Sequence, residues 1–128
     1  MLKEQKTESA RSIALFVLVE SLEHGRKLNE VLREQQTIYQ YLPKQERSFL
    51  NRLCKGVTER VIELDYVINQ FSKTNTQKMK PVIREILRMG VYQLLYMTQV
   101  PDSAACNEGV KLARKKGFSG LSGFVNGV

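Results

Sequence analysis

The most regular hydrophobic pattern in the chain runs from Val82 to Met97, with the sequence VIREILRMGVYQLLYM. On a helix, its aliphatic residues share one broad stripe with the i, i+3, i+4, i+7 spacing of a core-facing surface. The opposite side carries three large apolar residues among three polar ones, namely Met89, Tyr92 and Tyr96 among Glu85, Arg88 and Gln93. A helix that is apolar on two sides must be packed on both. We therefore expect this segment to be the central helix of a helical domain.

The same periodicity predicts four helices ahead of the central one. Ser9 is the expected N-cap of the first, and Gly25 is the residue expected to end it. Pro43 is suited to the first turn of the third helix, and a bend near 61–63 separates the third from the fourth. The four helices are expected at about 9–23, 28–36, 44–61 and 64–71.

Two segments flanking the central helix complete the predicted architecture. Residues 72–80, SKTNTQKMK, are rich in turn formers and carry three lysines, which is typical of a linker. The run Pro101, Asp102, Ser103 predicts the start of a sixth helix that ends near Lys116, and a last helix begins in FSGLSGFVNGV. No strand pattern or internal repeat interrupts this series, so we predict a single all-α domain over residues 1–128.

The net charge of +7 is concentrated in the second half of the chain. Residues 1–72 contain eleven Lys and Arg against ten Asp and Glu, whereas residues 73–128 contain nine against three. This asymmetry is common in domains that contact a polyanion, although a protein partner with an acidic face would fit it equally. The charge therefore favours a binding function and leaves the partner open.

The sequence offers little that would support catalysis or metal binding. Cys54 and Cys106 lie far apart at apolar helical phases, and His24 is the only histidine, in a polar turn. We expect buried thiols and a solvated histidine, with no metal site. No phosphate-binding glycine loop, Rossmann fingerprint or catalytic triad is present, and no signal peptide or long apolar run. These features predict a cytoplasmic binding domain without a membrane segment and without a catalytic site in these residues.

Several strings in the chain nevertheless carry a family resemblance. They are the ILR-x-G-x-YQLLY string at Ile86–Tyr96, the VPD-x-AA-x-NE-x-V string at Val100–Val110, and FVNGV at Phe124–Val128. Upstream, Arg11 with Ala14 and Leu15, and Arg47 with Phe49 and Leu50, fit the starts of the first and third helices. In this order and spacing they resemble the NusB-type helical domain, and more closely the N-terminal domain of the RsmB/Sun family of bacterial 16S rRNA cytosine-5 methyltransferases.

The resemblance implies an orthogonal bundle of about seven helices that binds RNA, with rRNA as the expected partner. In the methyltransferases this domain precedes a catalytic domain that binds S-adenosylmethionine. None of that domain is present in the sequence, so we expect a fragment that lacks the C-terminal methyltransferase domain, needs no cofactor itself and has that domain as a partner. The alternatives are a freestanding NusB-type transcription antitermination factor, which works with a ribosomal protein, and a protein-docking domain whose contact with RNA is incidental.

The expected RNA-binding surface consists of basic residues that would neutralise phosphates. The lysines at the end of the sixth helix have an alternative explanation, because cations there also suit the helix dipole. Arg84 and Arg88, on the flank of the central helix, are expected to hold carboxylates of neighbouring helices or of the missing domain, and Met89, Tyr92 and Tyr96 to form a structural or interface surface beside them. The predicted RNA-binding residues are Lys3, Lys6, Arg11, Lys78, Lys80, Lys111, Arg114, Lys115 and Lys116.

Overall fold

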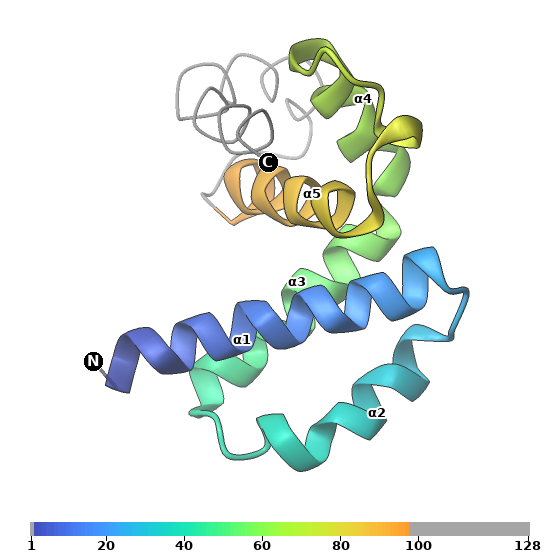
Figure 1. The fold of residues 1–128 in the computed structure, drawn as a ribbon. Helices are drawn as coiled ribbons and strands as arrows, with labels where there is room; N and C mark the ends of the chain where they lie inside the picture. Colours follow the sequence, from blue (N-terminus) through green and yellow to red (C-terminus); the bar gives the residue numbers. More distant parts are fainter. Residues whose placement is uncertain (1, 98–128) are drawn as a thin grey trace. The chain divides into compact units, whose positions relative to one another are not determined.

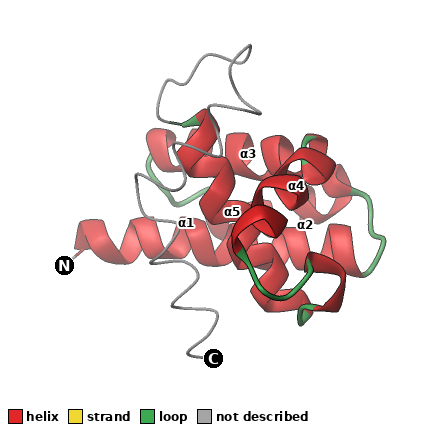
Figure 2. Cartoon of the chain, turned by 90° about the horizontal axis from the view of Figure 1, so that it is seen from above, coloured by secondary structure: helices red, strands yellow, loops and turns green. Residues whose placement is uncertain are grey.

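A computed structural model describes residues 2–97, with side chains from Ala10 onward. All regular elements in this part of the chain are helices, which short connections join (Figures 1 and 2). The α-helices are α1 (Leu2–Leu18), α2 (Leu28–Tyr39), α3 (Lys44–Glu59), α4 (Val61–Phe71) and α5 (Pro81–Tyr96). A π-helical turn, Val19–Glu23, follows α1, and a 3-10 turn, Thr76–Lys78, precedes α5.

The five helices predicted up to residue 97 are all present, but several of their boundaries were wrong. The third ends at Glu59 and the fourth begins at Val61, so residues 61–63, predicted as a bend, belong to α4. The first helix begins at Leu2 rather than at Ser9, since Lys, Glu and Gln favour a helix and no glycine or proline interrupts the start of the chain. The second continues past residue 36 to Tyr39, since no glycine or proline occurs before Pro43. Gly25, at φ 76°, ends the first helical segment as predicted, because only glycine adopts this conformation without strain. The helices predicted after Pro101 lie outside the described residues.

The chain divides into two compact units, residues 1–59 and residues 60–128, which we call unit 1 and unit 2. In unit 1, α1 packs against α3 and α2. Small residues of α1 permit this close packing, since Ala10 and Ala14 are fully buried. The rest of the core of unit 1 is Val17, Leu18, Val31, Leu32, Leu50, Leu53, Cys54 and Val57.

The described part of unit 2 is built on the packing of α4 against α5. The central helix predicted from the sequence is α5, and it is buried on two sides, as expected. The more buried side, however, is not the whole aliphatic stripe, because Ile83, Ile86, Gly90 and Leu94 remain partly exposed. The buried residues of α5 are Glu85, Leu87, Arg88, Met89, Val91, Tyr92, Leu95 and Tyr96. Two charged residues, Glu85 and Arg88, therefore lie in the core rather than at its edge.

No helix in residues 2–97 combines the length and the apolar character needed to cross a bilayer.

Candidate nucleic-acid interface

The connection between α4 and α5 is held in one conformation by short-range hydrogen bonds. The Ser72 hydroxyl donates to the Thr74 carbonyl at 2.8 Å and accepts from the Thr74 amide at 3.2 Å. Asn75 caps the 3-10 turn, because its side-chain oxygen accepts from the Gln77 amide at 2.9 Å. These polar side chains satisfy main-chain groups that would otherwise need water, which is their usual role in turns.

Contacts with both helices anchor the same connection to unit 2. From α4, the side-chain oxygen of Asn69 accepts a hydrogen bond from the Thr76 amide at 3.0 Å. From α5, Arg84 Nη1 donates to the carbonyls of Thr76, at 2.8 Å, and Met79, at 3.2 Å. The side chains of Thr76 and Met79 are themselves buried, with 2% and 7% exposed. The connection is therefore tied to the unit at its centre and at its end.

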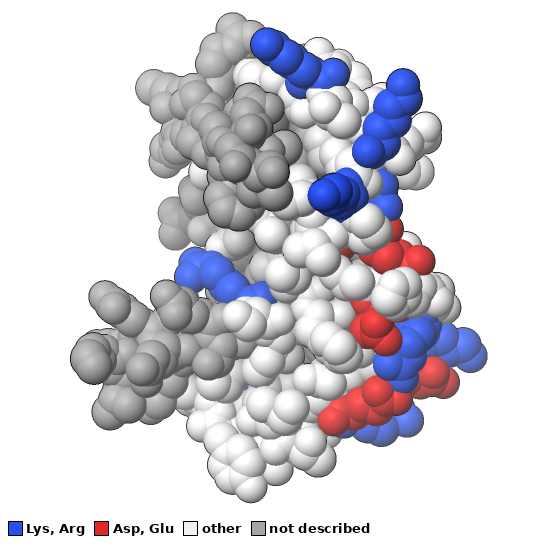
Figure 3. All heavy atoms as spheres, in the orientation of Figure 1, with Lys and Arg blue, Asp and Glu red and all other residues white. Residues whose placement is uncertain are grey.

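Three lysines of this anchored connection are exposed to solvent, and we call residues 72–80 the lysine loop. Met79 and Lys80 have extended backbones of the polyproline type. Met79 is buried, whereas Lys78 and Lys80 on either side of it are exposed. Lys73, at the beginning of the loop, is exposed as well. In Figure 3, blue basic atoms follow the course of this connection, with uncharged surface between them.

The carboxylates of residues 60–97 lie away from the lysine loop in the sequence and bond to other groups. This part of the chain has only three acidic residues, Glu63, Asp65 and Glu85, and no acidic residue occurs in 66–84. Arg88 donates from Nε and Nη2 to Asp65 on α4, at 2.8 and 2.7 Å, and from Nη1 to Glu85 at 2.7 Å. The prediction that Arg88 holds a carboxylate of a neighbouring helix is thus confirmed.

A second cluster joins the start of α4 to the end of α5. The Tyr96 hydroxyl donates to Glu63 and accepts from Arg60 Nη1 at 3.3 Å. Arg60 also lies over the Tyr96 ring, 4.2 Å from its centroid, in the geometry of a cation–π contact. Burial, together with the bond to the Glu63 carboxylate, raises the pKa of Tyr96 above its ordinary value.

The remaining structural candidates on α5 are also accounted for within the chain. Arg84 donates to main-chain carbonyls of the lysine loop. Met89, Tyr92 and Tyr96 are at most 8% exposed, and the two tyrosine rings stack with centroids 5.2 Å apart. These three side chains are thus part of the core and leave little surface for another domain.

The other predicted RNA-binding residues are only partly described. Arg11 is exposed on α1, with its guanidinium 5.3 Å from the centroid of the Phe49 ring. Lys3 and Lys6 belong to the first turns of α1, where side chains are not described. The four candidates from the predicted sixth helix, Lys111, Arg114, Lys115 and Lys116, lie outside the described residues.

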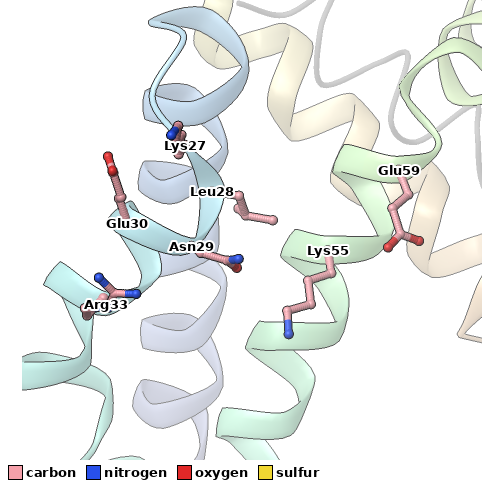
Figure 4. Close-up of a pocket in the computed structure, with 7 residues that line it drawn as sticks. All are labelled: Lys27, Leu28, Asn29, Glu30, Arg33, Lys55 and Glu59. Atoms are coloured by element: carbon pink, nitrogen blue, oxygen red, sulfur yellow. The ribbon is translucent and has the colours of Figure 1, made fainter.

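Unit 1 has a hollow of about 730 Å³ between the start of α2 and the second half of α3. Its lining combines three basic residues with two acidic ones, an amide and a leucine, and Figure 4 shows Asn29 and Lys55 projecting into the gap between the helices. Because carboxylates stand beside the cations, the hollow has no consistent charge. The lining residues are Lys27, Leu28, Asn29, Glu30, Arg33, Lys55 and Glu59.

Four titratable side chains of unit 1 bond to one another, and its described cysteine is buried. Arg26 bonds to both Glu20 and Glu34, and exposed His24 bonds to Glu20 at 2.8 Å. Hydrogen bonds from His24 and Arg26 hold the pKa of Glu20 below its ordinary value. Cys54 is fully buried, as predicted, and burial raises the pKa of its thiol to about 12. Among the described residues, no three His, Cys, Asp or Glu side chains gather as a metal site would require.

Sequence reasoning identified Lys78 and Lys80 but missed Lys73 as a member of the same surface. The signal was present, because all three lysines belong to the linker and no acidic residue accompanies them. The anchoring by Asn69 and Arg84 had no such signal, since it depends on how the loop folds back on two helices.

Comparisons with known proteins agree with this architecture. The chain is 36% identical over 123 residues to a probable ribosomal RNA small subunit methyltransferase B from Bacillus subtilis, and 37% identical over 120 residues to one from Synechocystis. These alignments cover 96% and 94% of this chain but only 27% of each relative. The transcription antitermination protein NusB of Acidothermus cellulolyticus is 44% identical over 78 residues, which are 60% of this chain and 54% of that protein.

A solved structure and a family profile give the same assignment. The structure of NusB from T. maritima matches with a TM-score of 0.63 at 22% identity, covering 94% of this chain and 85% of that one, and it supports the predicted all-α, NusB-like fold. The profile of the NusB family matches residues 8–128. The chain therefore belongs to the NusB family.

Proposed function

We propose that the chain is the RNA-binding accessory domain of an S-adenosylmethionine-dependent rRNA cytosine-5 methyltransferase. The observation that carries this proposal is the pattern of coverage: the two small subunit methyltransferases align with nearly the whole chain, which spans only 27% of their length. A domain that forms a quarter of a longer enzyme and has no catalytic constellation in its described residues suits an accessory role.

The domain would act by positioning its substrate. Exposed lysines and arginines neutralise phosphates and fix the orientation of an RNA strand, while contacts of this kind carry no sequence information directly. The lysine loop supplies such cations in residues 72–80. The residues described here, all helices and turns, do not fit S-adenosylmethionine, for which a strand followed by a glycine-rich turn would be expected. We assign the cofactor to the catalytic domain, which would be a partner of this one.

A second candidate is a freestanding antitermination factor of the NusB type. The identity of 44% to the antitermination protein of A. cellulolyticus favours it, because that alignment covers a larger share of its relative than the methyltransferase alignments do. A factor of this type would act together with a ribosomal protein. Both candidates would bind RNA, and they differ in the partner, which is a catalytic domain for the first and a ribosomal protein for the second. If the domain served instead mainly to dock on another protein, its contact with RNA would be incidental.

Equilibrium binding of the 128-residue chain to a small subunit rRNA fragment tests the proposal, with salt concentration as the variable. Phosphate-led binding predicts that the logarithm of the association constant falls linearly with the logarithm of salt concentration, without any ribosomal protein. Binding that is undetectable at low salt, or that does not respond to salt, would contradict the proposal. Binding that appears only when a ribosomal protein is added would favour the antitermination factor.

Charge reversal of Lys111, Arg114 and Lys115 tests the part of the surface proposed on the sixth helix. The substitution should weaken binding to different RNA sequences alike, because phosphate contacts do not discriminate between bases. An unchanged affinity would remove these three residues from the proposed surface and leave the lysine loop in it.

A further inference from the structure

We propose that the lysine loop binds phosphates of one RNA strand, with Lys78 and Lys80 on neighbouring phosphates, and that Arg84 is the positioning residue that holds the loop in shape. This inference rests on the proposed RNA-binding function and deepens it. It assigns a defined surface of unit 2 to the RNA backbone, and it gives the half-buried Arg84 a role in binding without contact with the ligand.

The backbone geometry of the loop sets the spacing between two cations. Lys78 and Lys80 are two residues apart on either side of Met79, whose side chain is only 7% exposed. Met79 has the dihedral angles of polyproline II, in which two residues advance the chain by about 6.2 Å. This separation is of the order of the distance between consecutive phosphates on one strand. A single strand following this surface could therefore meet both ammonium groups.

The electrostatic setting of the loop favours a polyanion over a protein of mixed charge. Residues 66–84 contain no acidic side chain, and the nearest acidic residues in sequence, Asp65 and Glu85, both accept hydrogen bonds from Arg88. A phosphate approaching the three lysines would thus meet little competition from neighbouring carboxylates. The hollow of unit 1, where Glu30 and Glu59 stand among the cations, lacks this property.

Arg84 links the loop to the core of unit 2. Its guanidinium donates to two carbonyls that precede α5, those of Thr76 and Met79. The interval between them contains Lys78, and Lys80 follows directly. A loop that is already ordered loses less conformational entropy when it binds, so its affinity is higher for the same contacts. Arg84 would therefore raise affinity by fixing the backbone, while the lysines make the contacts.

The experiment measures binding of the full 128-residue chain to a fluorescein-labelled single-stranded RNA of mixed sequence across a series of salt concentrations. In the lysine-loop variant, Lys73, Lys78 and Lys80 are replaced by glutamine together. Each phosphate contact on a single strand contributes a slope of about 0.7, so the slope should become shallower by about 2 and affinity should fall. The matched control replaces Lys27, Arg33 and Lys55 of unit 1 by glutamine, which removes the same charge and should leave the slope unchanged.

Arg84→Gln separates positioning from contact. This variant should weaken binding at every salt concentration and keep the wild-type slope, because no phosphate contact is lost. Asn75→Ala, which removes the cap of the 3-10 turn and no charge, should act in the same direction and serves as the second variant if Arg84→Gln fails to fold. Circular dichroism of each variant checks that the helices remain.

Each outcome bears on a separate claim. A wild-type chain that does not bind, or binds without salt dependence, overturns both the proposed function and this inference. A salt-dependent wild type with an unchanged lysine-loop variant, or with an equal loss in the unit 1 control, overturns this inference alone. An Arg84→Gln variant with unchanged affinity, or with a slope that falls as in the lysine-loop variant, overturns the positioning role.

Discussion

Two arginines of this protein each bond to two carboxylates, in very different surroundings. Arg26 of unit 1 joins Glu20 and Glu34, and the side chain of Arg26 is 34% exposed and that of Glu34 54%. Arg88 of unit 2 joins Glu85 and Asp65, and the side chain of Arg88 is 9% exposed and that of Glu85 0%. The first group is a set of surface ion pairs across the turn between α1 and α2. The second is part of the core between α4 and α5.

The difference shows that arginines and lysines have separate roles in the described part of unit 2. The arginines bond to carboxylates, main-chain carbonyls or the Tyr96 hydroxyl, whereas the lysines are exposed in one loop. In unit 1, exposed cations and carboxylates stand side by side, as Figure 3 shows for one face. A surface of paired charges has little net field, while a surface of lysines alone attracts anions. In residues 60–97 the acidic side chains bond to Arg60, Arg88 or Tyr96, and this pairing leaves the lysine loop positive.

The largest effect is expected for Arg88→Met. The substitution leaves the Glu85 carboxylate in the core and Asp65 without its arginine, so the free energy of unfolding should fall by about 3 to 5 kcal/mol. Urea denaturation followed by circular dichroism measures it. The double variant Arg88→Met with Glu85→Leu should regain much of the loss, because it removes the buried charge as well. A single variant as stable as the wild type would show that this ion pair is not part of the core.

Tyr96→Phe should have an intermediate effect, a loss of about 2 kcal/mol, because the hydroxyl bonds to two charged side chains. Tyr66→Phe, at an exposed position of α4, is the matched control and should leave stability unchanged.

A comparison of Tyr96→Phe with the wild type also tests the pKa of Tyr96. Because this pKa is raised in the folded protein, the stabilisation by the tyrosine is complete below its ordinary pKa of about 10 and is lost as pH rises above it. Unfolding measured on both sides of pH 10 should therefore show a steeper alkaline fall for the wild type than for Tyr96→Phe. Parallel curves for the two proteins would contradict the raised pKa.

The smallest effect is expected for Arg26→Met. Arg26 and its carboxylate partners are in contact with water, where the gain from an ion pair is offset by side-chain entropy and by screening. The unfolding curve of this variant should overlie that of the wild type at physiological salt. A loss comparable to that of Arg88→Met would abolish the distinction between the two arginines.

The sequence predicted the helices better than it predicted the role of their charges. Helical periodicity placed α5 and its two packed sides, because that signal lies within one segment. The burial of Glu85 could not be read in this way, since it depends on Arg88 meeting Asp65, 23 positions away on another helix. The lysine loop was visible as a composition, but its anchoring by Arg84 depends on the fold of the chain. Local patterns therefore indicated which residues were basic, and the structure separated those that hold the fold from those that face solvent.

One measurement compares the two units within a single sample of unmodified protein. The chain is treated with an acetylating reagent with and without the single-stranded RNA, and mass spectrometry reports the modification of each lysine. RNA bound at the lysine loop should protect Lys73, Lys78 and Lys80, while Lys27, Lys44 and Lys55 of unit 1 should react at the same rate in both samples. Equal protection of the two groups, or protection of the unit 1 lysines alone, would contradict binding at the lysine loop.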